Sequence, residues 1–232
     1  MVGKTGWSLS LFAAAALLTG CARGHAPKVK EDWLARVPPS QMQPVEQARA
    51  ELQQAQNEKN RAEVSLQDAR NRLDVAKAER DAAESRVKAA ENQVDLARNT
   101  GDSQRVKEAQ SQLTQAEAGM AAAEAQVEWA EANRDAAEAR VKYAEAEVRT
   151  HEALLSQAQY QVLADANDTR VEDMDPQSFE AEVSARRAES AQARRELEEK
   201  EQNVATAYQK WDEARSRAQQ QERPAPGEFP RG

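Results

Sequence analysis

The sequence contains few aromatic residues and a single cysteine. Only 4% of its 232 residues are Phe, Trp or Tyr, which is too few for a conventional globular core. Because Cys21 is the only cysteine, the chain has no internal disulfide and no cluster of thiolate metal ligands. The formal net charge of −8 argues against nucleic acid as a partner, since phosphates require clustered Lys and Arg.

Motifs that carry chemistry are also missing. The sequence has no glycine-rich nucleotide-binding loop and no G-x-S-x-G turn. Its two histidines, His25 and His151, have no His, Cys or paired carboxylates at metal-ligand spacing. We therefore predict no catalytic residue, no cofactor and no metal site, and we expect the protein not to be an enzyme.

The first 20 residues have the layout of a signal peptide. Lys4 precedes an apolar run over 7–18, which is too short to span a bilayer comfortably. The run ends in Leu18-Thr19-Gly20-Cys21, which resembles the lipobox of bacterial lipoproteins. That resemblance implies cleavage before Cys21, diacylglycerol on its thiol and an acyl group such as palmitate on its new amino terminus. An ordinary secretory signal with an incidental cysteine is the alternative.

The same resemblance predicts a location. Ala22, rather than Asp, follows the cysteine, which in lipoproteins favours the outer over the inner membrane. We therefore expect a periplasm-facing lipoprotein of the outer membrane, with the inner membrane or the cell surface as alternatives. Residues 21–44 contain Pro27, Pro38, Pro39 and Pro44, and this proline density predicts an extended tether. Within it, Trp33 and Leu34 could touch lipid headgroups or the rod that follows, or make only incidental contacts.

Residues 45–98 follow an unbroken heptad repeat. All eight of its "d" positions are alanine, and six of its eight "a" positions are Val or Leu. A spacing of 3.5 residues keeps one seam of a helix facing a partner helix, so the segment predicts a coiled coil. The helix should end at a turn over 99–103, where Gly101 can adopt the left-handed conformation and Asp102 or Ser103 can cap the next helix.

The repeat resumes over 103–163, and seven of its eight "d" positions are again alanine. Pairing residues whose numbers sum to 203 sets one alanine against one larger residue in almost every layer, as Leu73 against Ala130. The two halves therefore predict an antiparallel hairpin whose small and large side chains interdigitate.

The second helix carries another apolar stripe, roughly 160° around from the first. Its members are Ala122, Ala125, Trp129, Ala132, Ala136, Ala139, Tyr143, Ala146, Thr150 and Ala153. After a polar loop over 164–176, a third helix over 177–222 offers a matching stripe, and sums of 343 would place Trp211 on Ala132. We predict an all-α fold in which the third helix packs on the middle helix; pairing of either stripe with another copy of the chain is the alternative.

Charged residues interrupt the "a" positions at Lys59, Arg80 and Arg134. They could bind a partner or a phosphate, or they could fix the register and keep the rod soluble. The proline-rich tail over 223–232 should be disordered, or could act as a docking peptide.

The lipobox together with a helical rod resembles coiled-coil lipoproteins of the bacterial envelope, such as murein lipoprotein. This chain departs from that protein because it ends in Arg231-Gly232, without a terminal lysine for attachment to peptidoglycan. The hairpin is also similar to the α-hairpins of efflux adaptor proteins, although no β-rich flanking segment is visible.

These resemblances imply two functions. The first is a structural or scaffold lipoprotein, bound to the membrane by its lipid and to an envelope protein or a second copy by its helices. The second is an accessory subunit of an export or efflux assembly, with partner contacts at the hairpin tip: Asn99, Thr100, Gly101 and Asp102.

Overall fold

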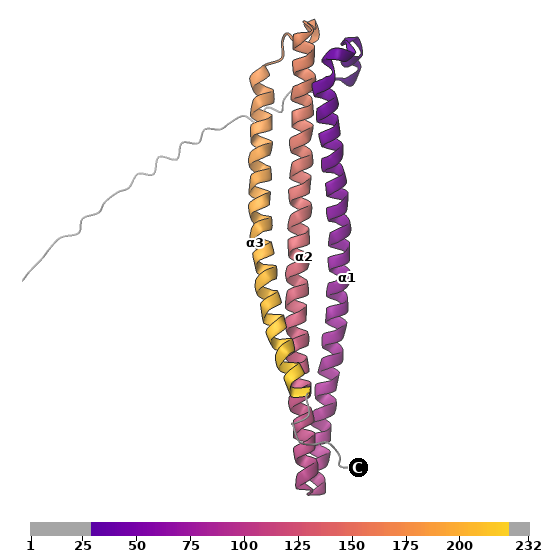
Figure 1. Ribbon diagram of the computed structural model, residues 1–232, viewed down its shortest axis with the longest axis vertical. Helices are drawn as coiled ribbons and strands as arrows, with labels where there is room; N and C mark the ends of the chain where they lie inside the picture. Colours follow the sequence, from indigo (N-terminus) through magenta and orange to yellow (C-terminus); the bar gives the residue numbers. More distant parts are fainter. Residues whose placement is uncertain (1–28, 223–232) are drawn as a thin grey trace, which may run out of the picture.

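The structure is a computed structural model, and it describes residues 29–222. Three long helices form a rod: α1 (Gln43–Thr100), α2 (Ser103–Asp165) and α3 (Pro176–Glu222), as Figure 1 shows. Three short 3-10 helices complete the described chain: η1 (Glu31–Arg36), η2 (Pro39–Gln41) and η3 (Thr169–Val171). The predicted all-α fold is confirmed, and each long helix starts and ends within two residues of its predicted bounds.

The α1–α2 hairpin has the predicted register. One buried cluster joins Leu73 and Ala76 to Val127 and Ala130, and both facing pairs have numbers that sum to 203. A second cluster near the tip joins Val94 and Ala97 of α1 to α2 in the same register. The eight "d" alanines of α1 are all at most 9% exposed: Ala48, Ala55, Ala62, Ala69, Ala76, Ala83, Ala90 and Ala97. Alanine in these positions lets the two helices approach closely.

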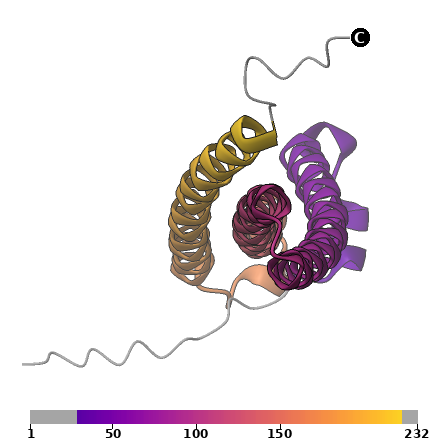
Figure 2. The same ribbon diagram turned by 90° about the horizontal axis from the view of Figure 1, so that it is seen from below.

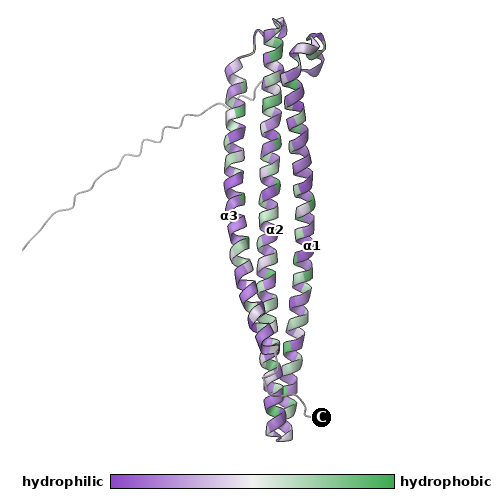
Figure 3. Ribbon diagram, in the orientation of Figure 1, coloured by the Kyte–Doolittle hydropathy of each residue, from purple (hydrophilic) through white to green (hydrophobic). Residues whose placement is uncertain are grey.

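Helix α2 lies at the centre of the rod. Seen along the axis in Figure 2, α1 and α3 curve around α2 on opposite sides. Both outer helices pack on α2, so the predicted three-helix arrangement is confirmed. Figure 3 shows that apolar residues are spread along the whole rod rather than gathered at one centre. The core is therefore a pair of long seams.

The register of α3 on α2 differs from the predicted sum of 343. Trp211 stacks on Trp129, not on Ala132, with ring centroids 4.8 Å apart, and these numbers sum to 340. Tyr160 stacks on Phe179 at 4.7 Å, a sum of 339. The helix is displaced by about three residues, or roughly 4.5 Å, because aromatic rings stack on each other in preference to sitting on alanine.

Helix α3 stops well before the tip. Below its last turn only α1 and α2 continue, as Figure 1 shows. The α3-facing stripe of α2 ends at the same level, because toward the tip it continues with the exposed polar residues Glu108, Ser111 and Gln115. The rod therefore has an open end, which we call the base, a three-helix part next to it, and a two-helix part that leads to the tip.

The expectation of an extended tether is wrong for residues 31–41. This segment forms η1 and η2 and folds onto the base. Leu34 and Val37 are buried with Val45, Val162 and Leu163 in one cluster. Proline does not prevent this fold, because Pro39 occupies the first turn of η2, where its missing N–H costs no hydrogen bond.

Candidate functional site

The predicted contact residues of the tip form a tight, self-contained turn. Gly101 has a left-handed backbone (φ 72°) and its N–H donates to the Arg98 carbonyl at 3.2 Å. The Asp102 carboxylate accepts from the backbone N–H groups of Gln104 (2.9 Å) and Arg105 (3.3 Å), which caps α2. The Thr100 hydroxyl donates to the Ala97 carbonyl at 2.7 Å. Thr100, Gly101 and Asp102 therefore have structural roles in the turn.

All four predicted tip residues, Asn99 to Asp102, are exposed. Their position at the end of the two-helix part makes them accessible to a partner that approaches along the rod axis. Asn99 is the member whose side chain makes no hydrogen bond in the turn described above. A partner contact at the tip would therefore involve Asn99 with the least disturbance of the hairpin.

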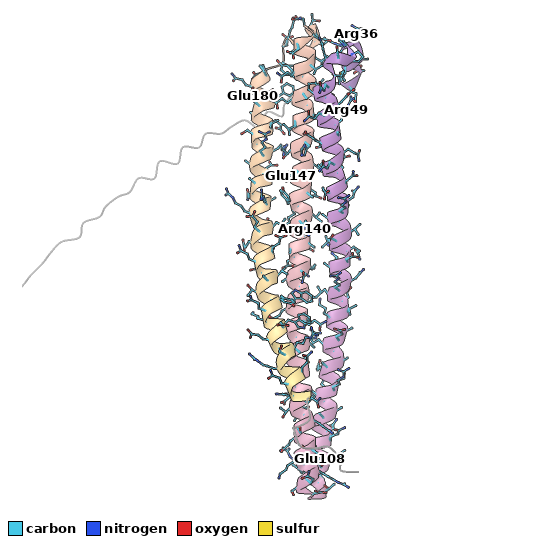
Figure 4. The ribbon with its side chains drawn as sticks, in the orientation of Figure 1. Arg36, Arg49, Glu108, Arg140, Glu147 and Glu180 are labelled. Atoms are coloured by element: carbon cyan, nitrogen blue, oxygen red, sulfur yellow. The ribbon has the colours of Figure 1, made fainter. Side chains whose placement is uncertain are left out.

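A groove of about 540 Å³ runs along the three-helix part between the outer helices, and sequence reasoning did not find it. Its lining residues come from all three helices: Glu51, Gln54, Ala55, Glu58, Arg61, Ala62 and Ser65 of α1, Arg140, Tyr143, Ala144, Glu147 and His151 of α2, and Leu197 of α3. Figure 4 shows Arg140 and Glu147 in the middle of the rod.

Charges in this groove tie α2 to α3. Arg140 donates to Glu201 of α3 at 2.6 Å, and the Ser190 hydroxyl donates to Glu147. Burial raises the pKa of Tyr143, with the negative charge of Glu147 adding to the effect. Arg140 and Glu147 in the groove therefore already form hydrogen bonds with residues of α3.

His151 lies in this groove. Its side chain is 24% exposed, and its Nδ1 atom is 3.7 Å from a Glu51 carboxylate oxygen, too far for a hydrogen bond. Within residues 29–222 no three His, Cys, Asp or Glu side chains are grouped as a metal ion would require. His151 is therefore a partly exposed packing residue.

The base contains an ion pair that the sequence did not reveal. Arg170 donates to the Asp168 carboxylate, and a second of its N–H groups reaches the Trp33 carbonyl at 3.2 Å. Its guanidinium also lies 5.3 Å from the centre of the Trp33 ring, a cation–π distance. The hydrogen bonds from Arg170 lower the pKa of Asp168 to about 2. Together these contacts hold η1 against the loop between α2 and α3.

The three cations at "a" positions have carboxylate partners within the chain. Lys59 is 3.3 Å from Glu63, Arg80 donates to Asp81 at 2.6 Å, and Arg134 donates to Asp135 at 2.6 Å. These hydrogen bonds raise the pKa of both arginines. The geometry favours the structural role of these cations over a phosphate-binding role.

Cys21, the predicted lipidation site, and the tail over 223–232 lie outside the described residues. None of the helices in the described part is long and apolar enough to cross a membrane. No protein-family model, no curated protein and no solved structure matches this chain.

Proposed function

We propose that this protein is a non-enzymatic lipoprotein of the bacterial cell envelope, and that it serves as a structural or scaffold rod facing the periplasm. The observation that carries the proposal is the sequence Leu18-Thr19-Gly20-Cys21 after a short apolar run. Several acyl chains on Cys21 would anchor the protein stably, since each buried methylene contributes roughly 0.8 kcal/mol. We favour the outer membrane because Ala22 follows the cysteine.

The fold supports this proposal through the position of the N-terminal segment. Nine residues, 22–30, lie between Cys21 and Glu31, the first residue of η1, and this segment can span at most about 35 Å. Since residues 31–41 pack on the base, an acylated Cys21 would hold the base near the membrane. The tip would then lie up to about 90 Å from the base, because α1 has 58 residues.

The test is the variant Cys21→Ser. We expect loss of acylation, measured by metabolic labelling with a fatty acid, and loss of the protein from the membrane fraction. Circular dichroism of the variant should show unchanged helix content, because Cys21 lies outside the rod, so that misfolding does not explain the loss. Membrane retention equal to that of the natural sequence, without fatty-acid labelling, would refute the anchor.

A second candidate function is an accessory subunit of an export or efflux assembly. The observation that favours it is the exposed tip at the end of the two-helix part, which can approach another helical protein end-on. In-cell crosslinking followed by mass spectrometry should then recover transport proteins, and Asn99→Arg should abolish the crosslink. Asn60→Arg, at an exposed position of the same helix, is the matched control and should leave it unchanged. Recovery of no transport component would leave the scaffold function as the better account.

A further inference from the structure

Helix α1 has a second apolar stripe that faces solvent. Val75 and Leu96 are 57% and 66% exposed, and three exposed alanines, Ala78, Ala82 and Ala89, lie between them on the same face. Four of these residues (75, 82, 89 and 96) are spaced by one heptad each. At 100° per residue the stripe lies roughly 160° from the seam that faces α2, so no part of the hairpin covers it.

The stripe is densest in the half of α1 that leads to the tip; toward the base, Val64, 64% exposed, lies on the same face. Farther toward the base, the same heptad position holds Gln54, Arg61 and Asp68, which are polar or charged. A helix face that only contacts water is expected to be polar along its whole length, and it would not carry apolar residues at heptad spacing over one half. The pattern indicates that a helix packs against 75–96.

We propose that this stripe is a self-association surface, along which two copies of the chain pair in antiparallel orientation. Facing residues within the stripe would have numbers that sum to 167, and facing residues along its two edges would have sums of 165 or 169. Ala82 would then meet Ser85 of the second copy, and Ala78 would meet its Ala89. The small residues at the centre allow the two α1 helices to approach closely.

In this register Val75 lies opposite Asn92 of the second copy and Leu96 lies opposite its Asn71, so the closest approach is at the small residues. With sums of 167, Thr100 at the end of α1 lies opposite Gln67 of the second copy. The overlap therefore runs over 67–100 in each chain.

Flanking charges are complementary in the antiparallel pair. Asp81 would face Lys88 of the second copy, and Glu79 would face its Arg86, which gives four attractive pairs by symmetry. Asp74 would face Asp95 at each end, which gives two repulsive pairs. Lys88 and Arg86 are the only cations among these residues. Each of them would lie next to an acidic residue of the other copy.

A parallel, in-register pair is less favourable. It would set Asp81 near Arg86 of the second copy but Asp74 near its Glu79, so attractive and repulsive pairs would be equal in number. Within one chain, Lys88 is 2.6 Å from Glu84 and Arg80 is 2.6 Å from Asp81. These pairs are on the exposed surface and can rearrange when a second helix arrives.

Antiparallel pairing would place the two bases at opposite ends of the dimer. Residue 43 is about 60 Å from the centre of the overlap, so the bases would lie about 120 Å apart. The dimer would be a strut with its folded N-terminal segments at both ends. This inference does not rest on the proposed lipid anchor.

Disulfide trapping tests the orientation. In the full chain with Cys21→Ser, the variants A78C and A89C carry one thiol each and are made with different tags. Mild oxidation of the mixture should give a disulfide between the two variants, while each variant alone should give little. Strong crosslinking of A78C with itself would indicate parallel pairing and overturn the proposal.

Sedimentation equilibrium tests self-association without cysteines. The full chain should approach twice its 25.7 kDa mass, and Ala82→Glu should return it to the monomer mass. Because Ala82 is exposed, this variant should keep the helix content of the unaltered chain. Ala50→Glu, at another exposed alanine of α1, is the matched control and should remain a dimer. A monomer at the highest soluble concentration, or equal effects of both variants, would overturn the proposal.

Discussion

Replacement of Trp211 by alanine should detach the lower part of α3 from α2. Trp211 stacks on Trp129 almost in parallel, with an interplanar angle of 5°. The ring of Tyr208 lies edge-on to both, with centroids 5.6 Å from Trp211 and 5.7 Å from Trp129. Arg215 adds a cation–π contact at 5.4 Å from the Trp211 ring. This cluster holds the only ring–ring contacts that the described chain makes between α2 and α3 away from the base.

The expected loss of stability follows from these contacts. A half-buried tryptophan removes about 100 Å² of apolar surface from water, which is worth about 2.5 kcal/mol at 25 cal/mol per Å². Each lost aromatic pair contributes about 0.5–1.5 kcal/mol beyond that area. Because water can refill a site at the surface, we place the total at about 3 kcal/mol, at the low end for a fully buried tryptophan.

Urea unfolding followed by circular dichroism measures this change, and a double-mutant cycle with Trp129→Ala isolates the stack. We expect a coupling free energy of about 1 kcal/mol between Trp129 and Trp211. Trp33→Ala, at the far end of the rod, should combine additively with Trp211→Ala. If the coupling free energy between Trp129 and Trp211 is as small as that between Trp33 and Trp211, the two rings do not touch. The register in which Trp211 lies on Ala132 would then be the better account.

Two further predictions concern the hairpin seam and the base. Ala76→Phe should overpack the layer shared with Val127 and lower the free energy of unfolding by about 1–3 kcal/mol, measured by urea titration; Ala50→Phe, at an exposed site, is its control, and equal effects would contradict the seam. At the base, Arg170 holds the pKa of Asp168 near 2, below its ordinary 3.8, so the ionised carboxylate stabilises the fold above about pH 4 and this contribution is lost as the pH falls through 2. Carboxyl NMR should show this titration in the natural sequence and a pKa closer to 3.8 in Arg170→Gln; a wild-type titration near pH 4 would contradict the ion pair.

The hairpin could be predicted in detail because its sequence leaves one workable register. Small residues occupy all but one of the "d" positions and large ones most "a" positions, so a slip of a few residues would set alanine against alanine and open gaps. The turn at Gly101 adds a second constraint, since its position fixes the sum of facing residue numbers. Both constraints are local or periodic, which is why the sequence alone reveals them.

The register of α3 could not be predicted as precisely. The α3-facing stripe of α2 is alanine at five of its seven positions from Ala132 to Ala153, and a row of alanines accepts several offsets at similar cost. Matching large to small residues, which was correct for the hairpin, placed Trp211 on Ala132. The stacking of Trp129 on Trp211 decides the offset instead, and no periodicity in the sequence expresses that preference.

The folded base was missed for a different reason. Trp33 and Arg170 are 137 residues apart, and each lies in a segment whose composition predicts an irregular chain. The apolar pair Leu34 and Val37 was the one available signal, since both would be exposed in an extended tether. Proline excludes long helices and strands, but it is compatible with 3-10 turns that pack on a neighbouring surface.

The ends of the rod differ in how much of their surface is already engaged, and this difference indicates where partners bind. At the base, η1 and η2 cover the open end of the hairpin and bury Leu34 and Val37 against it. Along α1 three large apolar side chains of the described chain are exposed, Val64, Val75 and Leu96, and the last two lie a whole number of heptads apart. Burial of apolar area drives helix association, so the part of α1 that holds Val75 and Leu96 gains from a partner. We therefore expect substitutions at exposed residues near the tip to change association, and substitutions at the base to change stability.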